Sequence, residues 1–370
     1  MKTNISCLLL MCLSLMIMSC GDNASSPLVT GWAIGWSEDA GISSVKILKT
    51  DNGGATWTLQ ALPVGCEGFR GNDISAVNHR VAWAAMNSDI DNPNSGILHT
   101  ADGGTSWTIQ AIPDGMTNRQ IKNIKGVSPT EAWAVSIGGD VLHTTDGGVS
   151  WNIVEVKDVD GIIIEMTQVN RMDVTGQDIW IVDVNSHDLG VIHSPDGGLT
   201  WWREYLPDVL HEHGPLAISA FSSLIAWAAV NSEGYLWWTG NGGRSWNKST
   251  DSISGTADFD DICASSANVV WIAQNNGLSS GGVAARVIVT NGIFSSHLFT
   301  DINYMMEGVA AMNDNVAWLV GFKTFTADPS LPKGVIYFTS DGGLNWQLQA
   351  MPANALDVNL WKVSFVGARR

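Results

Sequence analysis

The feature that most constrains the fold is a hairpin motif, T-x-[DN]-G-G-x-[ST]-W in its commonest form, which occurs six times. The copies span Thr50–Trp57, Thr100–Trp107, Thr144–Trp151, Ser194–Trp201, Thr239–Trp246 and Thr339–Trp346. A short apolar strand precedes each copy, and the paired glycines supply the positive φ angles of a tight turn. Self-similarity at a fixed period indicates a repeat architecture, so this motif decides the fold class before any other feature.

A second repeat runs in step with the hairpins, because a tryptophan closes an apolar strand in every unit. These residues are Trp32, Trp83, Trp133, Trp180, Trp227, Trp271 and Trp318, and they recur every 44 to 51 residues. With a further short strand upstream of most of them, each unit holds four short strands, which is the pattern of a propeller blade. The sixth unit has lost its hairpin signature, since no Gly-Gly or Trp follows Thr290-Asn291-Gly292.

The two ends of the chain complement each other. The first strand, at Gly31-Trp32-Ala33, has no inner strand before it, and residues 360–366 at the other end resemble such an inner strand. Pairing the two segments closes the ring and removes the free sheet edges. We therefore predict an all-β fold, a single seven-bladed β-propeller of four-stranded blades over residues 31–370, closed by pairing the C-terminal strand with the N-terminal blade.

Residues 1–19 have the pattern of a signal peptide. Lys2 supplies positive charge, and the apolar stretch Cys7 to Met18 is too short to span a membrane. The segment ends Ile17-Met18-Ser19-Cys20, which resembles the lipobox of bacterial lipoproteins. That resemblance implies a lipidated Cys20, a polar tether over residues 20–30, and an exported lipoprotein of the cell envelope, at the outer membrane or surface. The alternative is an ordinary cleaved signal with an unmodified cysteine.

Charge and cysteine content exclude several classes of protein. The net charge of −17 disfavours contact with phosphate backbones, so we expect no nucleic-acid partner. No segment after Cys20 is long and apolar enough to span a membrane, so we expect membrane contact through the lipid anchor only. Cys66 and Cys263 lie about four repeats apart, hence on nearly opposite sides of a closed ring, and we expect buried thiols and no disulfide.

The hairpins resemble the Asp-box, or bacterial neuraminidase repeat. The consensus S/T-x-D-x-G-x-T/S-W fits Thr100–Trp107, Thr144–Trp151 and Ser194–Trp201, and Thr339–Trp346 departs from it only at Asn345. Within that superfamily, a single ring with Trp-Ala strands and Gly-Gly hairpins is most similar to the photosystem II stability/assembly factor-like group. The resemblance covers almost the whole mature chain, and it is specific for the fold and weakly specific for function.

The assembly factor resemblance implies binding to a partner membrane protein through a positively charged patch. This sequence departs from that pattern, because Arg70, Arg119, Arg171 and Arg286 are scattered and the chain is strongly acidic. The resemblance therefore extends to the fold and to a binding role, and it leaves a photosystem client in doubt.

Two enzyme groups share the same box. Sialidases use three arginines, a Tyr–Glu pair and an Arg-Ile-Pro segment before the first box, and no Arg-Ile-Pro occurs here. Xyloglucan hydrolases resemble two propellers facing each other across a cleft, each supplying one carboxylate, whereas this chain has one ring. We therefore predict no catalytic residue, no cofactor and no metal.

The candidate ligand surface is the face opposite the box turns, where the loops entering each inner strand and the loops after Trp-Ala gather. Asp89 and Asp91 offer alternate oxygen ligands but lack the terminal Glu of a calcium loop, and His211 and His213 lack a visible third ligand. For both loops a solvated loop is favoured over a metal site. The remaining candidates for this face are Arg70, Arg119 and Tyr304, which offer guanidinium and aromatic groups near the central mouth.

These observations predict a non-catalytic, lipid-anchored envelope propeller that binds a protein partner, in an assembly or scaffold role, on the face opposite the boxes. The alternative is a glycan-binding or glycoside-hydrolysing propeller of the sialidase-like superfamily, and a purely structural surface protein is a third possibility. An enzyme requires carboxylates with perturbed pKa values that converge at the channel mouth. A binding module requires an exposed aromatic or hydrophobic patch there.

Overall fold

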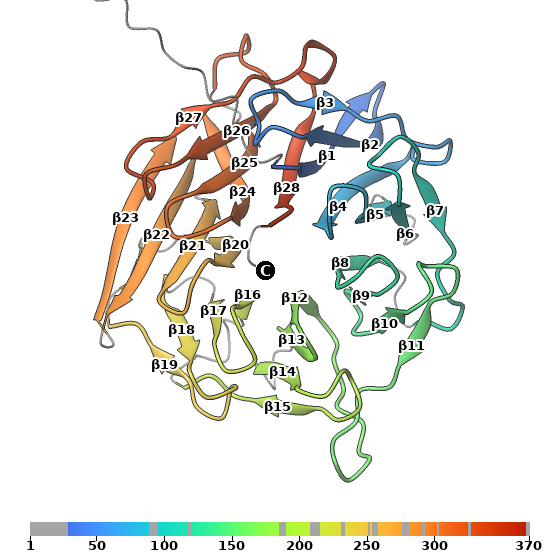
Figure 1. Cartoon of the computed structure of the whole chain (residues 1–370), viewed down its shortest axis with the longest axis vertical. Helices are drawn as coiled ribbons and strands as arrows, with labels where there is room; N and C mark the ends of the chain where they lie inside the picture. The colour runs from blue at the N-terminus through green and yellow to red at the C-terminus, as the bar shows by residue number, and fades with distance from the viewer. Residues whose placement is uncertain are drawn as a thin grey trace, which may run out of the picture.

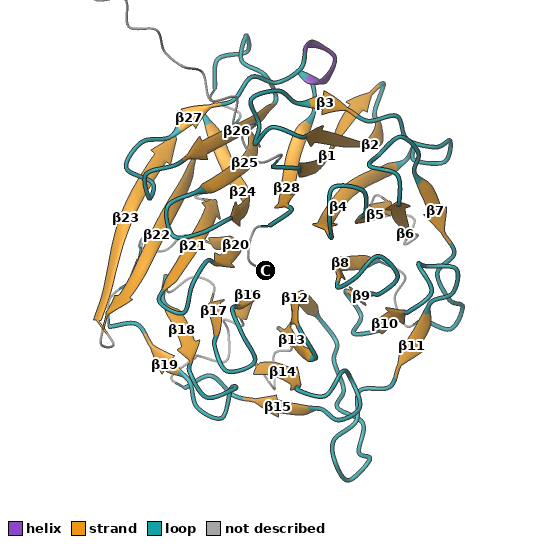
Figure 2. Ribbon diagram, viewed as in Figure 1, coloured by secondary structure: helices purple, strands orange, loops and turns teal. Residues whose placement is uncertain are grey.

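A computed structural model shows seven four-stranded antiparallel sheets arranged as blades around a central axis (Figures 1 and 2). It describes residues 29–88, 95–116, 120–184, 190–207, 215–230, 234–250, 252–253, 258–275, 281–290, 293–301, 303–324 and 327–367. Within these residues the helical content is one 3-10 turn, η1 (Ala353–Ala355), and no helix is long and apolar enough to cross a membrane. The predicted all-β, seven-bladed propeller is confirmed.

Each blade has an inner strand at the axis and an outer strand at the rim. Blade 1 contains β28 (Asn359–Phe365), β1 (Gly31–Asp39), β2 (Ile42–Thr50) and β3 (Thr58–Leu59). Blade 2 contains β4 (Phe69–Ala76), β5 (Ala82–Ser88), β6 (Ser95–Thr100) and β7 (Thr108–Gln110). Blade 3 contains β8 (Ile121–Gly126), β9 (Ala132–Ser136), β10 (Val141–Thr144) and β11 (Asn152–Val154). Blade 4 contains β12 (Val169–Thr175), β13 (Asp178–Asp183), β14 (Gly190–Ser194) and β15 (Trp202–Glu204).

The remaining blades follow the same order. Blade 5 contains β16 (Pro215–Ala220), β17 (Ala226–Val230), β18 (Leu236–Thr239) and β19 (Asn247–Lys248). Blade 6 contains β20 (Asp258–Ala264), β21 (Val269–Asn275), β22 (Gly282–Thr290) and β23 (Ile293–Asp301). Blade 7 contains β24 (Tyr304–Ala311), β25 (Ala317–Lys323), β26 (Gly334–Thr339) and β27 (Gln347–Leu348).

The ring closes between its first and last strands, as predicted. β28 pairs antiparallel with β1, from Gly31 opposite Phe365 to Trp36 opposite Asn359. The Phe365 ring also stacks on Trp318 of blade 7, with centroids 3.7 Å apart. The last strand therefore contributes to blade 1 through its backbone and to the contact with blade 7 through its side chain.

Interlocking aromatic rings fill the spaces between blades. The hairpin tryptophan of one blade meets the strand tryptophan of the preceding blade edge to face, a favourable geometry for aromatic pairs. Such pairs are Trp107 on Trp32 at 88°, Trp151 on Trp83 at 87°, Trp246 on Trp180 at 89°, and Trp346 on Trp271 at 88°. The strand tryptophans are at most 3% exposed, so this interlock forms the core between the blades.

The hairpin turn itself is held by its own side chains. In the second copy, Gly103 and Gly104 have φ angles of 77° and 83°. The Asp102 carboxylate accepts hydrogen bonds from the Ser106 backbone N–H at 2.9 Å and from the Thr100 hydroxyl at 3.0 Å. The hydrogen bond from the Ser106 hydroxyl, followed by those from the Ser106 backbone N–H and the Thr100 hydroxyl, lowers the pKa of Asp102 to about 2. The residues that recur in the hairpin motif thus form hydrogen bonds within the turn itself.

Candidate functional site

The alternating direction of the strands determines which turns and loops lie on each face of the ring. The turns between first and second strands and the box turns lie on one face, because antiparallel strands alternate in direction. The loops that enter β4, β8, β12, β20, β24 and β28 therefore lie on the opposite face, together with the loops between second and third strands. We call this opposite side the loop face.

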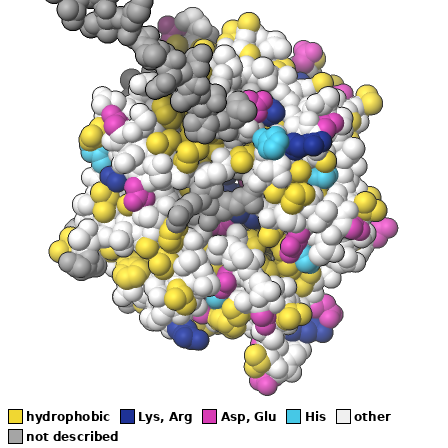
Figure 3. Space-filling model, in the orientation of Figure 1, with side chains coloured by type: hydrophobic (Ala, Val, Ile, Leu, Met, Phe, Trp, Pro, Cys, Tyr) yellow, Lys and Arg dark blue, Asp and Glu magenta, His cyan; other side chains and the backbone are white. Residues whose placement is uncertain are grey.

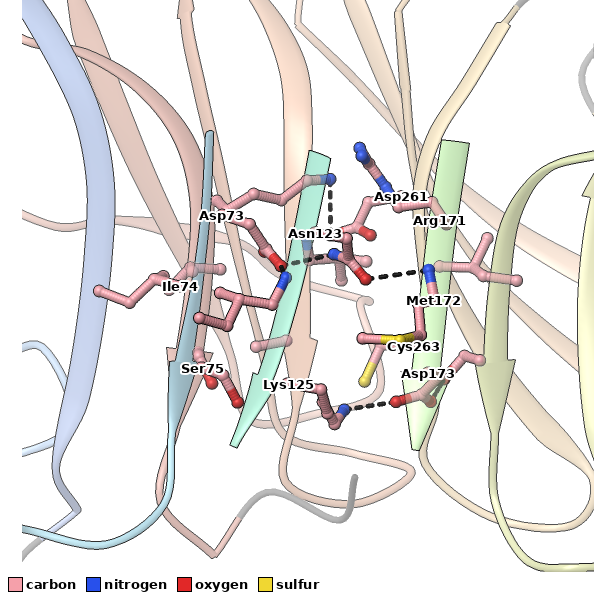
Figure 4. Close-up of a pocket in the computed structure, with 18 of the residues that line it drawn as sticks. Asp73, Ile74, Ser75, Asn123, Lys125, Arg171, Met172, Asp173, Asp261 and Cys263 are labelled. Carbon is pink, nitrogen blue, oxygen red and sulfur yellow. Dashed lines mark hydrogen bonds and ion pairs between the residues drawn. The ribbon is translucent and has the colours of Figure 1, made fainter. Parts of the chain in front are cut away.

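A polar cavity of about 120 Å³ lies on the axis, between the inner strands (Figure 4). At six of the seven junctions, a side chain of one inner strand accepts a hydrogen bond from a backbone N–H of the next. The pairs are Asp73 with Ile124, Ser75 with Gly126, Asn123 with Met172, Asp173 with Ala220, Ser219 with Ala264, Asp261 with Val309, and Ser364 with Ala76. Donor–acceptor distances are 2.8 to 3.1 Å. These side chains join neighbouring blades around the axis.

The seventh junction, between β24 and β28, is joined by a lysine. The Lys362 ammonium lies 3.0 Å from the Asp261 carboxylate and donates to the carbonyl oxygen of Glu307 at 2.8 Å. Lys125 and Asp173 form a second ion pair across the cavity, at 2.5 Å. Arg171 donates to the carbonyl oxygen of Asp260 at 2.8 Å. The cations of the channel are thus paired with carboxylates or with carbonyl oxygens.

Burial shifts the pKa values of several channel groups. Desolvation raises the pKa of Asp73 to about 6 and that of Glu307 to about 7. Desolvation, with the charges of Arg171 and Lys362 nearby, lowers the pKa of Lys122 to about 8. Perturbed carboxylates of this kind are also a feature of catalytic sites, so their surroundings decide their role.

Geometry assigns the channel carboxylates a structural role. Asp73 accepts bonds from the Asn123 side chain and the Ile124 backbone, and Asp261 is paired with Lys362. The cavity is also smaller than the roughly 300–1,000 Å³ of typical small-molecule pockets. These groups therefore connect the blades.

Three aromatic rings gather at the loop face. Trp36, near the end of β1, lies 5.4 Å from Trp361 of β28 and 5.9 Å from Phe322 of β25, measured between ring centroids. Phe322 also stacks on Trp361 at 5.9 Å. All three rings are partly exposed. Because these strand ends meet at the loop face, the rings form a patch across blades 7 and 1.

Arg70 extends this patch onto blade 2. Its guanidinium carbon lies 5.4 Å from the centre of the Trp36 ring, within range of a cation–π interaction, and its Nε donates to the Ser43 hydroxyl at 3.1 Å. Arg70 is exposed, so the guanidinium is held by Trp36 and Ser43 while remaining in contact with solvent. We call Trp36, Arg70, Phe322 and Trp361 the rim cluster.

Of the other predicted site residues, Tyr304 is buried and the rest lie outside the described part of the chain. Tyr304 is only 5% exposed, and its hydroxyl donates to the carbonyl oxygen of Pro332 at 3.3 Å, so it supports a loop from inside and does not reach the surface. Five residues lie outside the described part of the chain: Asp89, Asp91, Arg119, His211 and His213. Cys20 lies outside it too, so its lipidation stays a prediction. Within the described residues no cluster of His, Cys, Asp or Glu could hold a metal ion.

Both cysteines of the ring are free thiols, as expected. Cys66 is buried as expected, whereas Cys263 lines the central cavity and is partly exposed. Burial raises the pKa of Cys66 to about 11 and that of Cys263 to about 12, so both remain protonated and unreactive near neutral pH.

Sequence reasoning missed three members of the rim cluster. Trp361 was expected only as part of the closing strand, and Trp36 and Phe322 were not singled out. A signal for the first two exists in hindsight: each lies four residues after a blade-closing tryptophan, at the loop-face end of that strand. No such positional signal marks Trp361, which lies at the register shift of β28 against β1, between Leu360 opposite Gly35 and Lys362 opposite Ile34.

Basic side chains on the face shown in Figure 3 are interspersed with acidic and apolar ones, and those of the described residues gather into no single patch there. A broad positive surface, which the assembly factor resemblance implies, is thus not seen on that face.

Comparison with known proteins agrees with the fold. The family model described as photosynthesis system II assembly factor YCF48 matches residues 114–267. Among curated proteins none matches the chain. Of the solved structures, YCF48 bound to D1 peptide is 18% identical with a TM-score of 0.56, covering 84% of this chain and 93% of that one. YCF48 from Cyanidioschyzon merolae is 14% identical with a TM-score of 0.59, covering 86% and 97%.

A GH74 enzyme from Niastella koreensis is similar as well, at 12% identity and a TM-score of 0.51. The match covers 87% of this chain and 57% of that enzyme, so the chain spans little over half of its length. At these identities the structural likeness concerns the fold alone. The family model, the hairpin repeat and the fold agree, and the chain is a seven-bladed β-propeller similar to the YCF48 photosystem II assembly factors.

Proposed function

We propose that this propeller is a non-catalytic binding protein that holds a partner polypeptide at the rim cluster, in an assembly or scaffold role. The observation that carries the proposal is the exposed Arg70 guanidinium held over the partly exposed Trp36, beside Phe322 and Trp361. Aromatic and arginine side chains are the residues most enriched where protein interfaces concentrate their binding energy.

The comparisons support the same role. A family model of assembly factors matches the centre of the chain, and one similar propeller has been solved with a bound D1 peptide. A polypeptide ligand is therefore the partner class that these proteins favour. In this chain, such a ligand would contact an exposed arginine beside three aromatic rings.

We further propose that the propeller is exported and tethered to a membrane of the cell envelope through a lipid on Cys20. Support comes from the apolar segment that precedes the sequence Ile17-Met18-Ser19-Cys20. The first ring strand begins at Gly31, so a tether of about ten residues separates the anchor from the ring. Such a tether leaves the loop face free to meet a membrane-associated partner.

A comparative pull-down tests the binding site. The mature chain serves as bait in detergent-solubilised envelope, next to Arg70→Ala and Trp361→Ala, and recovered proteins are quantified. The matched controls, Arg244→Ala and Leu199→Ala, remove an exposed arginine and an 80% exposed leucine from box turns on the other face. We expect a specific partner with wild type and both controls, reduced at least about tenfold by the rim variants.

Circular dichroism and melting temperature must show that each variant remains folded. Equal recovery with wild type and folded rim variants would exclude the rim cluster as the site. Recovery of no specific partner, together with turnover of a glycan panel, would favour the enzyme alternative.

Anchoring is tested separately with Cys20→Ser. We expect the wild-type chain to incorporate labelled fatty acid and to partition with detergent, and the variant to do neither. A wild-type chain that is cleaved but carries no lipid would show an ordinary signal peptide, leaving the binding proposal unaffected.

A further inference from the structure

The outer strand of blade 6 differs from every other outer strand of the ring. β23 has nine residues and pairs along its whole length with the nine residues of β22. The outer strands of the other six blades have two or three residues. In Figures 1 and 2 this long hairpin stands at the perimeter of the ring, and within the described residues no strand pairs with its outer side.

β23 lacks the devices that keep a free strand edge from pairing. Natural edges are protected by lysine, proline, bulges or shortness. Residues Ile293 to Thr300 include no charged residue and no proline, and the pairing with β22 runs without a register shift. Ile293 is 69% and Leu298 46% exposed, so apolar side chains face solvent along this edge. A nine-residue edge of this kind is a template for a further strand.

The sequence of β23 is self-complementary about Ser296. The residues on either side read apolar, apolar, polar, then Ser296, then polar, apolar, apolar: Ile293, Phe294, Ser295 and His297, Leu298, Phe299. An antiparallel pair of identical strands centred on Ser296 places Phe294 opposite Leu298, Ile293 opposite Phe299, and Ser295 opposite His297. Aromatic–aliphatic pairs directly across an antiparallel ladder stabilise the pairing. A shift of the centre by one residue to His297 would instead oppose Ser295 to Phe299 and Ile293 to Asp301.

We propose that β23 is a self-association edge at which a second copy of this chain adds its own β23, antiparallel about a twofold axis at Ser296. The two blades then form one continuous eight-stranded sheet. A twofold interface uses the same patch on both copies, and the palindromic pattern of β23 meets that requirement.

Charge also favours a second copy at this place. Two chains of net charge −17 repel each other over most of their surface, and the stretch Ile293 to Thr300 of β23 is a long segment without carboxylates at which they can meet. The edge lies at the perimeter, away from the loop face, so the rim cluster remains accessible in the dimer. This proposal is therefore independent of the proposed partner binding.

Oligomeric state across a concentration series tests the proposal. The mature chain is measured by sedimentation velocity and light scattering, next to Leu298→Lys, which places charge on the edge. The matched control, Leu348→Lys, changes a 65% exposed leucine on the two-residue outer strand β27. We expect a concentration-dependent dimer for wild type and control, and a dissociation constant at least about tenfold higher for Leu298→Lys.

Cross-linking tests the register. Residues directly opposite in an antiparallel pair have Cα atoms about 4.5–5.5 Å apart, within the range of a disulfide. Ser296→Cys should therefore give a disulfide-linked dimer on mild oxidation, whereas Gln347→Cys, exposed on β27, should not. A wild-type chain that stays monomeric at all concentrations, or a Leu298→Lys chain that dimerises equally, would overturn the proposal. Loss of a pulled-down partner with Leu298→Lys, without a dimer, would assign the edge to a partner strand instead.

Discussion

Phe294 meets Trp227 edge to face, with ring centroids 6.3 Å apart and an interplanar angle of 87°. That is the geometry in which the hairpin tryptophans of other blades meet the strand tryptophan of the preceding blade, at 87° to 89°. Blade 6 has no hairpin tryptophan, so Phe294, at the start of β23, takes its place. The interlock between blades therefore survives the loss of the box sequence.

Mutating Phe294 should show that its ring takes the place of the hairpin tryptophan that blade 6 lacks. Phe294→Ala should lower the free energy of unfolding by about 1–3 kcal/mol, because it removes a partly buried ring from Trp227, whereas Phe294→Trp should cost much less. Urea unfolding of the monomer at low protein concentration measures both. Equal losses for Ala and Trp would mean that the edge-to-face contact contributes little.

Ring closure should depend on Phe365. This residue is 2% exposed, stacks on Trp318 at 3.7 Å and meets Trp57 at 5.9 Å. Phe365→Ala should therefore destabilise the chain by about 3–5 kcal/mol. Leu356→Ala, at a 45% exposed position of the same C-terminal segment, should cost less than about 1 kcal/mol. A Phe365→Ala chain as stable as the Leu356→Ala chain would show that closure rests on the backbone pairing of β28 alone.

Much of this fold is predictable because repetition makes weak local signals add up. Seven tryptophan-closed strands and six hairpins determine the number of blades, and the C-terminal strand fits the gap before Gly31. The partner of Trp227 was not predictable in the same way, since Phe294 matches no box position. The rim cluster was missed for a related reason: it joins residues of three blades, and their proximity depends on ring closure.

Of the two predicted ligand-face residues that the structure describes, Arg70 lies in that cluster and Tyr304 does not, because exposure cannot be read from residue type. Tyr304 illustrates the converse, being an aromatic at the start of an inner strand that the loop above it buries. The polar side chains that join the inner strands were also missed. They alternate with apolar residues as in any strand, and only the ring brings each beside the next blade.

The box carboxylate should matter for acid stability. Asp102, with its pKa lowered to about 2, favours the folded state above its ordinary pKa of 3.8, and that contribution is lost as the pH falls from 3.8 toward 2. Asp102→Asn should keep most of the turn, since Asn52 of the first hairpin accepts the equivalent bond from the Thr56 N–H at 2.9 Å. Melting temperatures at neutral pH should fall for Asp102→Ala and change little for Asp102→Asn. On acidification to about pH 2.5 the Asn variant should lose less of its melting temperature than wild type. Parallel losses would contradict this role.

Glu307 should give the opposite pH dependence. Desolvation raises its pKa from 4.5 to about 7, so the folded state holds a proton that the unfolded state has already released. Stability contributed at this position is therefore fully present below about pH 4.5 and falls as the pH rises toward 7.

Glu307→Gln keeps an oxygen that can accept the 3.2 Å bond from the Asn275 side chain but cannot ionise. Between about pH 4.5 and 7.5, the free energy of unfolding should fall on the order of 2 kcal/mol more for wild type than for Glu307→Gln. Urea titrations at several pH values measure this difference. Asp73, whose pKa is raised to about 6, titrates in both proteins and so cancels in the comparison. Identical pH profiles would show that Glu307 is already ionised in the folded channel, held in that state by Lys362 and Arg171.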